Sequence, residues 1–261
     1  MLAVFSNRVK FVTMHDRPVA IITGGGRGIG AACARKLAER GYAPVLMSLS
    51  DSAPRLAAEL DGAGISGSVS KDEDLRALVD LAIGRYGRID AVISSTGHPS
   101  WARTPESSIY QYDEEDHLLD IPDEEWHKML DVLVLPAVRL ARLVTPQMCR
   151  QRKGAIVNIS GLGAAVPATK YPFGAMIRHA LVGFAQIYTA HYARYGIRMN
   201  NVLPGFMDNI EWSTELTRSI PAGRPGKLAE LAGTIAFLLS DEAAYISGRD
   251  LLVDGGAART M

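Results

Sequence analysis

Short runs of apolar residues alternate along this chain with longer stretches in which apolar residues recur every three to four positions. The continuous runs are typical of strands buried on both faces, and the longer period is typical of helices that pack by one face. The predicted strands are 19–22, 43–47, 65–69, 89–93, 155–159, 197–203 and 251–253. The predicted helices are 29–40, 53–60, 72–86, 122–150, 173–195 and 227–239. This alternation predicts an α/β fold, with about seven strands in a doubly wound parallel sheet flanked by helices.

The predicted helix at 122–150 contains prolines. Pro122 opens it, and three acidic residues follow in its first turn, which suits the positive end of a helix dipole. Pro136 and Pro146 lie further along and are expected to bend or shorten the helix.

The pattern also predicts how the chain is divided. Residues 98–121 have mixed polarity and no sustained period, so we expect a long loop there. Residues 1–13 match neither a signal peptide nor an amphipathic helix, and we expect a loose N-terminal extension. With no linker and no repeat in the remainder, residues 14–261 are expected to form a single domain.

Composition narrows the function classes. The chain has 48% hydrophobic and 21% charged residues and a net charge of zero, so nothing favours nucleic acid or an anionic membrane as a partner. No apolar run approaches the roughly 20 residues that a membrane span needs. Cys33 and Cys149 lie far apart in helical patterns, so we expect free thiols and a cytoplasmic location.

A glycine-rich loop joins the first predicted strand to the first predicted helix. The apolar run that ends at Ile22 leads into Thr23-Gly24-Gly25-Gly26-Arg27-Gly28-Ile29-Gly30, and a helical pattern follows at once. Glycines let a backbone approach a pyrophosphate closely, and a helix N-terminus presents free N–H groups to it. The loop therefore predicts a nucleotide-binding site.

The spacing Thr23-Gly24-x-x-x-Gly28-x-Gly30 resembles that of the short-chain dehydrogenase/reductase family. Ser160 after Asn158-Ile159, residues 200–205 and Val253-Asp254-Gly255-Gly256 add to the resemblance, which extends over about residues 17–256. It implies a Rossmann-type domain and hydride transfer between a nicotinamide cofactor and a small carbonyl or alcohol substrate, as in 3-oxoacyl-carrier-protein reductases. It also implies a homotetramer or homodimer.

The same resemblance assigns the cofactor contacts. They are Gly24, Arg27, Gly28, Ile29 and Gly30 in the loop, Ser48 and Leu49, Ser68 and Val69, Ser95, Thr96 and Gly97, and Pro204, Gly205, Phe206 and Met207.

The second strand bears on cofactor preference. Enzymes of this fold that use NAD carry an acidic residue at its end, which holds the ribose 2′-hydroxyl. Ser48 stands there instead, and Arg27 could pair with a 2′-phosphate, so NADP(H) is favoured over NAD(H). Asp51 is close enough in the chain to restore a preference for NAD(H), and Arg27 could simply cap the loop.

The catalytic centre departs from the family pattern of serine, tyrosine, lysine and asparagine. Ser160 matches the serine, which bonds the substrate oxygen. Counting 13 residues on from Ser160 puts Phe173 at the tyrosine position and Ile177 at the lysine position. Counting back from the end of the same helix puts Gly174 and Arg178 there instead. Neither register contains Tyr-x-x-x-Lys.

Leu133 occupies the position of the asparagine that anchors a relay water. Two residues are candidates to replace the missing groups: Arg178 as a ribose clamp, and Tyr171 as a proton donor. His98, which follows Gly97 directly, is a further candidate, and no metal site is expected from the acidic run at 113–117.

Two functional hypotheses follow. The first is an NAD(P)(H)-dependent oxidoreductase with a non-standard proton donor. The second is a cofactor-binding sensor or assembly subunit that has lost redox chemistry, which the apolar residues at Leu133 and at Phe173 and Ile177 favour.

Overall fold

The computed structural model describes residues 17–96, 122–166 and 172–258. Within them, seven parallel strands form one sheet in the order β3-β2-β1-β4-β5-β6-β7. The strands are β1 (Val19–Thr23), β2 (Ala43–Ser48), β3 (Ala63–Ser66), β4 (Ala91–Ser94), β5 (Gly154–Ile159), β6 (Ile197–Pro204) and β7 (Asp250–Val253). The predicted doubly wound parallel sheet is therefore confirmed.

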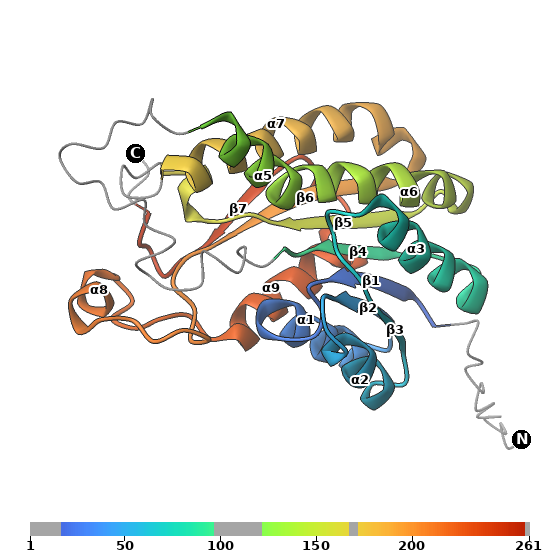
Figure 1. Cartoon of the computed structure of the whole chain (residues 1–261), viewed down its shortest axis with the longest axis horizontal. Helices are drawn as coiled ribbons and strands as arrows, with labels where there is room; N and C mark the ends of the chain where they lie inside the picture. The colour runs from blue at the N-terminus through green and yellow to red at the C-terminus, as the bar shows by residue number, and fades with distance from the viewer. Residues whose placement is uncertain (1–16, 97–121, 167–171, 259–261) are drawn as a thin grey trace, which may run out of the picture.

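Helices cover both faces of the sheet (Figure 1). One face carries α1 (Gly28–Glu39), α2 (Ser52–Glu59) and α9 (Leu228–Leu239). The other face carries α3 (Asp72–Tyr86), α5 (Asp123–Leu133), α6 (Leu135–Gln151) and α7 (Pro172–Tyr192). The short helix α8 (Thr214–Ser219) stands apart from the sheet. No helix in these described ranges is both long enough and apolar enough to cross a membrane.

The side chains of β1 alternate between the two faces of the sheet, and each face packs against helices. Val19 and Ile21 point into the core formed with α3, α6 and α7, whereas Ala20 and Ile22 point into the core formed with α1, α2 and α9. All four side chains are completely buried. A strand with cores on both sides has to be apolar at every position, and this produces the continuous run seen in the sequence.

The helix predicted over 122–150 is two helices. The chain breaks at Val134, and Pro136 lies in the first turn of α6, where a missing N–H needs no partner. Pro146, in contrast, lies inside α6 without ending it. The prediction that proline shortens this segment is confirmed at Pro136 alone.

Two strand boundaries also differ from the prediction. β3 ends at Ser66, because the N–H of Ser68 donates to the Asp74 carboxylate (2.8 Å) and the chain is already turning into α3. β4 begins at Ala91, since the backbone N–H and C=O of Ile89 bond instead to the side chain of Gln151 (2.9 and 2.7 Å).

The remaining differences lie near the helices. The helix predicted over 173–195 ends at Tyr192 and continues as a 3₁₀ turn, and α8 was missed because its residues are polar and lack a period. The predicted extension at 1–13 lies outside the described residues, and so does the whole of the predicted loop at 98–121.

Candidate functional site

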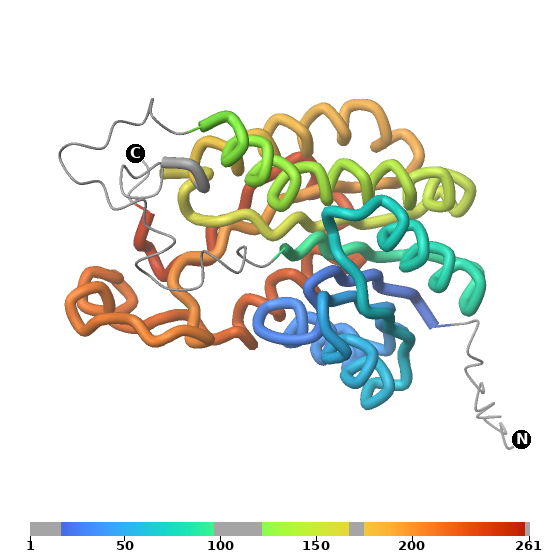
Figure 2. Tube along the Cα trace, in the orientation of Figure 1, coloured from blue at the N-terminus to red at the C-terminus, as the bar shows by residue number. Residues whose placement is uncertain are grey.

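The site lies where the strand order reverses. β1 and β4 are neighbours in the sheet, but the chain continues from β1 toward β2 and from β4 toward β5, in opposite directions (Figure 2). In open α/β sheets a crevice forms at this point, outside the carboxyl ends of the strands, and ligands bind there. The glycine loop follows β1 directly and so borders the crevice.

The first and last glycines of the loop are required because other backbone atoms approach them closely. Gly24 has φ +60°, and a Cβ there would lie 2.6 Å from the carbonyl oxygen of Ser95. A Cβ on Gly30 would lie 2.2 Å from the carbonyl oxygen of Gly24. The Thr23 hydroxyl completes the contact across the crevice, because it accepts from the Ser95 N–H (3.0 Å) and donates to the Ser95 C=O (3.1 Å).

The N-terminus of α1 is suited to an anion. Arg27 is the N-cap residue in extended conformation, and its side chain makes no capping bond within the described part of the chain. No acidic residue lies in the first turn of α1. The N–H groups of Gly28, Ile29 and Gly30 are among the first four of the helix, which have no partner inside it. Together with the helix dipole they fit a pyrophosphate.

The end of β2 is built from serine hydroxyls. Ser48 donates to the C=O of Ser50 (2.8 Å) and accepts from the N–H of Ala53 (3.1 Å), while the Ser52 hydroxyl lies 3.1 Å from that of Ser48. Leu49 is 79% exposed. Asp51 is ion-paired with Arg55 one turn along α2. The charge nearest to Ser48 in sequence is therefore already matched by a cation.

The other predicted cofactor residues also lie at the carboxyl edge of the sheet. Ser95 is 7% exposed, Thr96 is half-buried, and Gly97 lies outside the described residues. Ser68 and Val69 follow β3.

Pro204, Gly205, Phe206 and Met207 lie at the end of β6 and just beyond it. Phe206 packs edge-on against Trp212 (5.0 Å between ring centroids). Met207 is buried, and its carbonyl accepts from the Trp212 indole (2.8 Å).

One residue that the list of cofactor contacts left out belongs to this edge. The Asn209 amide nitrogen lies 3.9 Å from where a Cβ on Gly28 would be. A side chain from the loop after β6 thus reaches the glycine loop after β1. The family resemblance places Asn209 where a threonine usually follows the segment over the nicotinamide, but nothing in the sequence indicated that it reaches the glycine loop.

Ser160, the first of the predicted catalytic residues, lies at the end of β5. Ser160 is 7% exposed, and its hydroxyl is buried with no hydrogen-bond partner among the described residues. Gly161 faces α7: a Cβ there would lie 3.3 Å from Nε of Arg178 and 3.6 Å from its Cζ. Burial lowers the pKa of Arg178 to about 10, so the guanidinium stays charged at neutral pH.

The two helical registers left open by the sequence have different environments. Arg178 points to the end of β5, whereas Ile177 is buried among Met129, Leu133 and Leu181 between α5, α6 and α7. Leu133 thus lies in the same apolar cluster. Tyr171 and His98 lie outside the described residues, and so does the side chain of Phe173.

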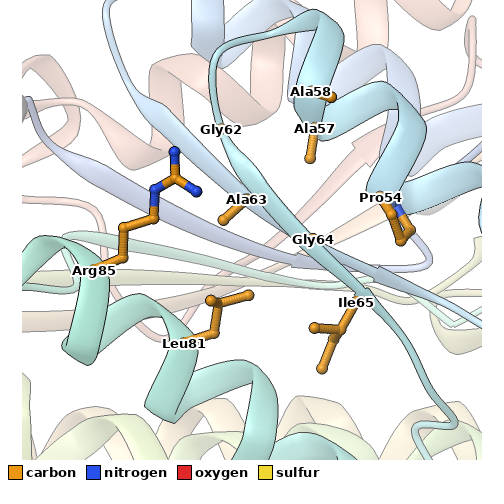
Figure 3. Close-up of a pocket in the computed structure, with 9 residues that line it drawn as sticks. All are labelled: Pro54, Ala57, Ala58, Gly62, Ala63, Gly64, Ile65, Leu81 and Arg85. Carbon is orange, nitrogen blue, oxygen red and sulfur yellow. The ribbon is translucent and has the colours of Figure 1, made fainter.

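Two cavities elsewhere in the described residues contain none of these groups. One of about 280 Å³ lies along β3 between α2 and α3 (Figure 3). Its lining is mostly small and apolar, with Arg85 as the charged member. A larger one of about 760 Å³ lies at the amino ends of the strands. Four of its charged side chains form two ion pairs, Arg88 with Asp90 and Lys153 with Asp241, and the fifth, Arg198, donates to backbone carbonyls.

The fold and the glycine loop together define a Rossmann-type α/β protein with an anion site at the strand-order reversal. Comparisons with known proteins agree. Residues 24–258 match the family model described as Enoyl-(Acyl carrier protein) reductase. The chain belongs to the short-chain dehydrogenase/reductase family of oxidoreductases.

Individual relatives extend this comparison. The chain is 29% identical over 248 residues to the 3-oxoacyl-(acyl-carrier-protein) reductase FabG of Vibrio cholerae, covering 91% of this chain and 96% of that protein. It is 30% identical to the L-fucose dehydrogenase of Mus musculus, with 94% and 90% covered. The crystal structure of YwfH, an NADPH-dependent reductase involved in bacilysin biosynthesis, shares the fold with a TM-score of 0.81 at 22% identity. The structural alignment covers 94% of this chain and 100% of the YwfH chain.

Proposed function

We propose that this protein reduces the carbonyl group of a small molecule with NADPH, with Ser160 and Arg178 holding the reacting oxygen. The observation that carries the proposal is the end of β5. There the hydroxyl of Ser160 has no partner among the described residues, and the open side of the next residue, Gly161, faces the guanidinium of Arg178. Relatives named as a 3-oxoacyl-(acyl-carrier-protein) reductase and an L-fucose dehydrogenase support the same chemistry.

The loop residues fit the cofactor. The Gly24–Ser95 and Gly30–Gly24 approaches leave room for backbone only, and the open N-terminus of α1 provides N–H donors for the pyrophosphate. When bound, the nicotinamide supplies the hydride.

The protein groups act on the oxygen. As hydride reaches the carbonyl carbon, negative charge develops on the substrate oxygen, and preorganised donors at that position lower the barrier. Ser160 donates a hydrogen bond, which also removes the penalty of about 1–3 kcal/mol for leaving its buried hydroxyl unpaired. Arg178 contributes a fixed positive charge. Tyr171 is the proposed proton donor, and a water molecule is the alternative.

The test is steady-state oxidation of NADPH against a panel of aldehydes and ketones. Ser160→Ala is expected to lower kcat by about 10²-fold while leaving the Kd of NADPH unchanged, because the hydroxyl acts on the substrate oxygen alone. Tyr171→Phe is expected to lower kcat by a similar factor, as the loss of a general acid does. Activity that both variants retain in full would refute these roles.

The second hypothesis predicts a different outcome in the same assay. Leu133 and Ile177 are packed in an apolar cluster and cannot exchange protons, which favours a cofactor-binding sensor or assembly subunit. Tight NADPH binding without turnover of any carbonyl would support that role and refute the reductase.

The preference for NADP(H) rests on the end of β2. Ser48 carries no charge, Asp51 is paired with Arg55, and Arg27 lies at the start of α1 on the same side of the crevice. A ribose 2′-phosphate therefore meets hydroxyl groups and a cation there rather than an unpaired carboxylate.

Ser48→Asp is expected to reverse this preference. An aspartate can still accept from the Ala53 N–H at the N-terminus of α2, but its charge would repel a 2′-phosphate. We expect the Kd of NADPH to rise at least about tenfold and that of NADH to fall, as measured by fluorescence titration. Ser219→Asp on the exposed face of α8 is the control. An unchanged NADPH/NADH ratio would contradict the assignment.

A homotetramer or homodimer and a cytoplasmic location complete the proposal. The exposed apolar residues of α7, Met176 at 49% and Ile187 at 63%, support self-association through that helix.

A further inference from the structure

A row of polar side chains crosses the sheet beneath α7. Register pairs Ser94 of β4 with Asn158 of β5, Asn158 with Asn201 of β6, and Asn201 with Asp250 of β7. Asn158 and Asn201 are 1% and 0% exposed, whereas Asp250 is exposed on the edge strand. Four neighbouring strands thus carry polar residues side by side, two of which are almost completely buried, and this needs a reason.

Asp250 determines the orientation of both amides. A carboxylate only accepts hydrogen bonds, so the Asn201 amide nitrogen must face it, and the two atoms lie 2.7 Å apart. The same nitrogen donates to the Leu181 carbonyl of α7 (3.0 Å), which fixes the group a second time. The Asn201 oxygen then faces Asn158 and accepts from its amide nitrogen (2.9 Å).

The consequence is an acceptor at the inner end of the row. With its nitrogen committed to Asn201, Asn158 directs its Oδ1 away from β6, and this oxygen is buried without a partner among the described residues. Ser160 has the same deficit. The Ser160 N–H continues the ladder by donating to the Val202 carbonyl (2.9 Å), so Ser160 and Asn158 share one face of the extended chain.

We propose that Asp250, Asn201 and Asn158 form a positioning row that holds one enclosed water molecule between Asn158 Oδ1 and Ser160 Oγ. The Cα atoms of residues two apart on a strand are about 6.6 Å apart, and their side chains share one face. One water molecule with two hydrogen bonds joins oxygens that are about 5–6 Å apart, so the two side chains need only lean slightly toward each other. The water donates one hydrogen to Asn158 and the other to Ser160. Ser160 then has its own hydrogen available for the substrate oxygen, so the inference rests on the proposed role of Ser160.

The hydrogen bonds of the row therefore all point the same way, toward Asp250. Each member accepts on the side nearer the site and donates on the side nearer Asp250, and the acceptor-only carboxylate at the edge sets this polarity for the whole row. Without the Asp250 carboxylate, only the Leu181 carbonyl would hold the Asn201 amide, and the amide groups of Asn201 and Asn158 could flip together. Asn158 would then present N–H groups to the water, and Ser160 would be led to donate to that water instead of to the substrate.

The direct test is a crystal structure of the full chain at a resolution that shows ordered water. We expect one water within hydrogen-bond distance of both Asn158 Oδ1 and Ser160 Oγ. A direct hydrogen bond between the two side chains, or no water between them, would overturn the proposal. This readout needs no turnover, so its failure is distinguishable from failure of the proposed reductase activity.

The functional test changes the edge of the sheet rather than its interior. Asp250→Ala is expected to lower kcat about threefold to tenfold, the value of one hydrogen bond, while KM for NADPH stays the same. Asp250→Glu keeps an acceptor-only carboxylate for Asn201 and is expected to restore kcat. Asp241→Ala is the matched control, because Asp241 is an 82% exposed carboxylate that is paired with Lys153 at the amino ends of the strands.

Thermal unfolding of the three variants separates positioning from simple loss of structure. We expect Asp250→Ala to melt close to the wild type because Asp250 is exposed. A kcat equal to the wild type in Asp250→Ala, or a loss that Asp250→Glu does not restore, would overturn the proposed row.

Discussion

Gly30→Ala is expected to abolish measurable binding of NADPH. A Cβ at position 30 would lie 2.2 Å from the carbonyl oxygen of Gly24 and 2.7 Å from its carbonyl carbon. Both are backbone atoms, so the clash can be relieved only by moving α1 away from β1. A displacement of about 1 Å at a site of this kind costs about 100-fold. Overpacking should also lower the free energy of unfolding by about 1–3 kcal/mol.

Fluorescence titration with NADPH and thermal unfolding together measure this effect. Gly84→Ala is the matched control, since Gly84 is exposed inside α3 and a Cβ there would have no neighbour within 4 Å. Because alanine is the better helix former, this control should stabilise the protein by about 0.5–1 kcal/mol and leave the Kd unchanged. Normal NADPH affinity in a folded Gly30→Ala variant would refute the assignment of the pyrophosphate to this loop.

Arg178→Met is expected to lower kcat by about 10²–10³-fold. The guanidinium faces Gly161, and removing a charge preorganised for the substrate oxygen costs that much in rate. The melting temperature is measured beside kcat, because a side chain that only supported packing would change the melting temperature and leave kcat unchanged.

A loss of kcat in a variant that stays folded is the diagnostic result. Arg178→Lys should retain part of the activity, since it keeps the charge but not the planar fork. Arg35→Met is the control on the exposed surface of α1, where the ion pair with Glu59 is expected to contribute little. A large drop in melting temperature with unchanged kcat in Arg178→Met would show that the arginine only supports the packing of α7.

The catalytic end of α7 illustrates the limit of counting along a sequence. The two registers differ by one residue, and one step along a helix turns a side chain by about 100°. Ile177 faces the apolar cluster with Met129 and Leu133, and Arg178 faces Gly161. Apolar and charged residues were both visible in the sequence, but which of them meets β5 depends on how α7 is rotated against the sheet.

The sequence by itself determined the alternation of strands and helices, the parallel sheet and the glycine loop. These depend on local signals: β1 is apolar throughout because it is buried on both faces, and Gly24 and Gly30 leave room that no side chain could share. Only the tertiary structure decided which distant groups meet. The row from Asp250 to Asn158 joins three strands, and the approach of Asn209 to Gly28 joins two loops, at separations over which a sequence carries no pattern. Such contacts follow from strand register and helix packing, which are set by the whole core at once.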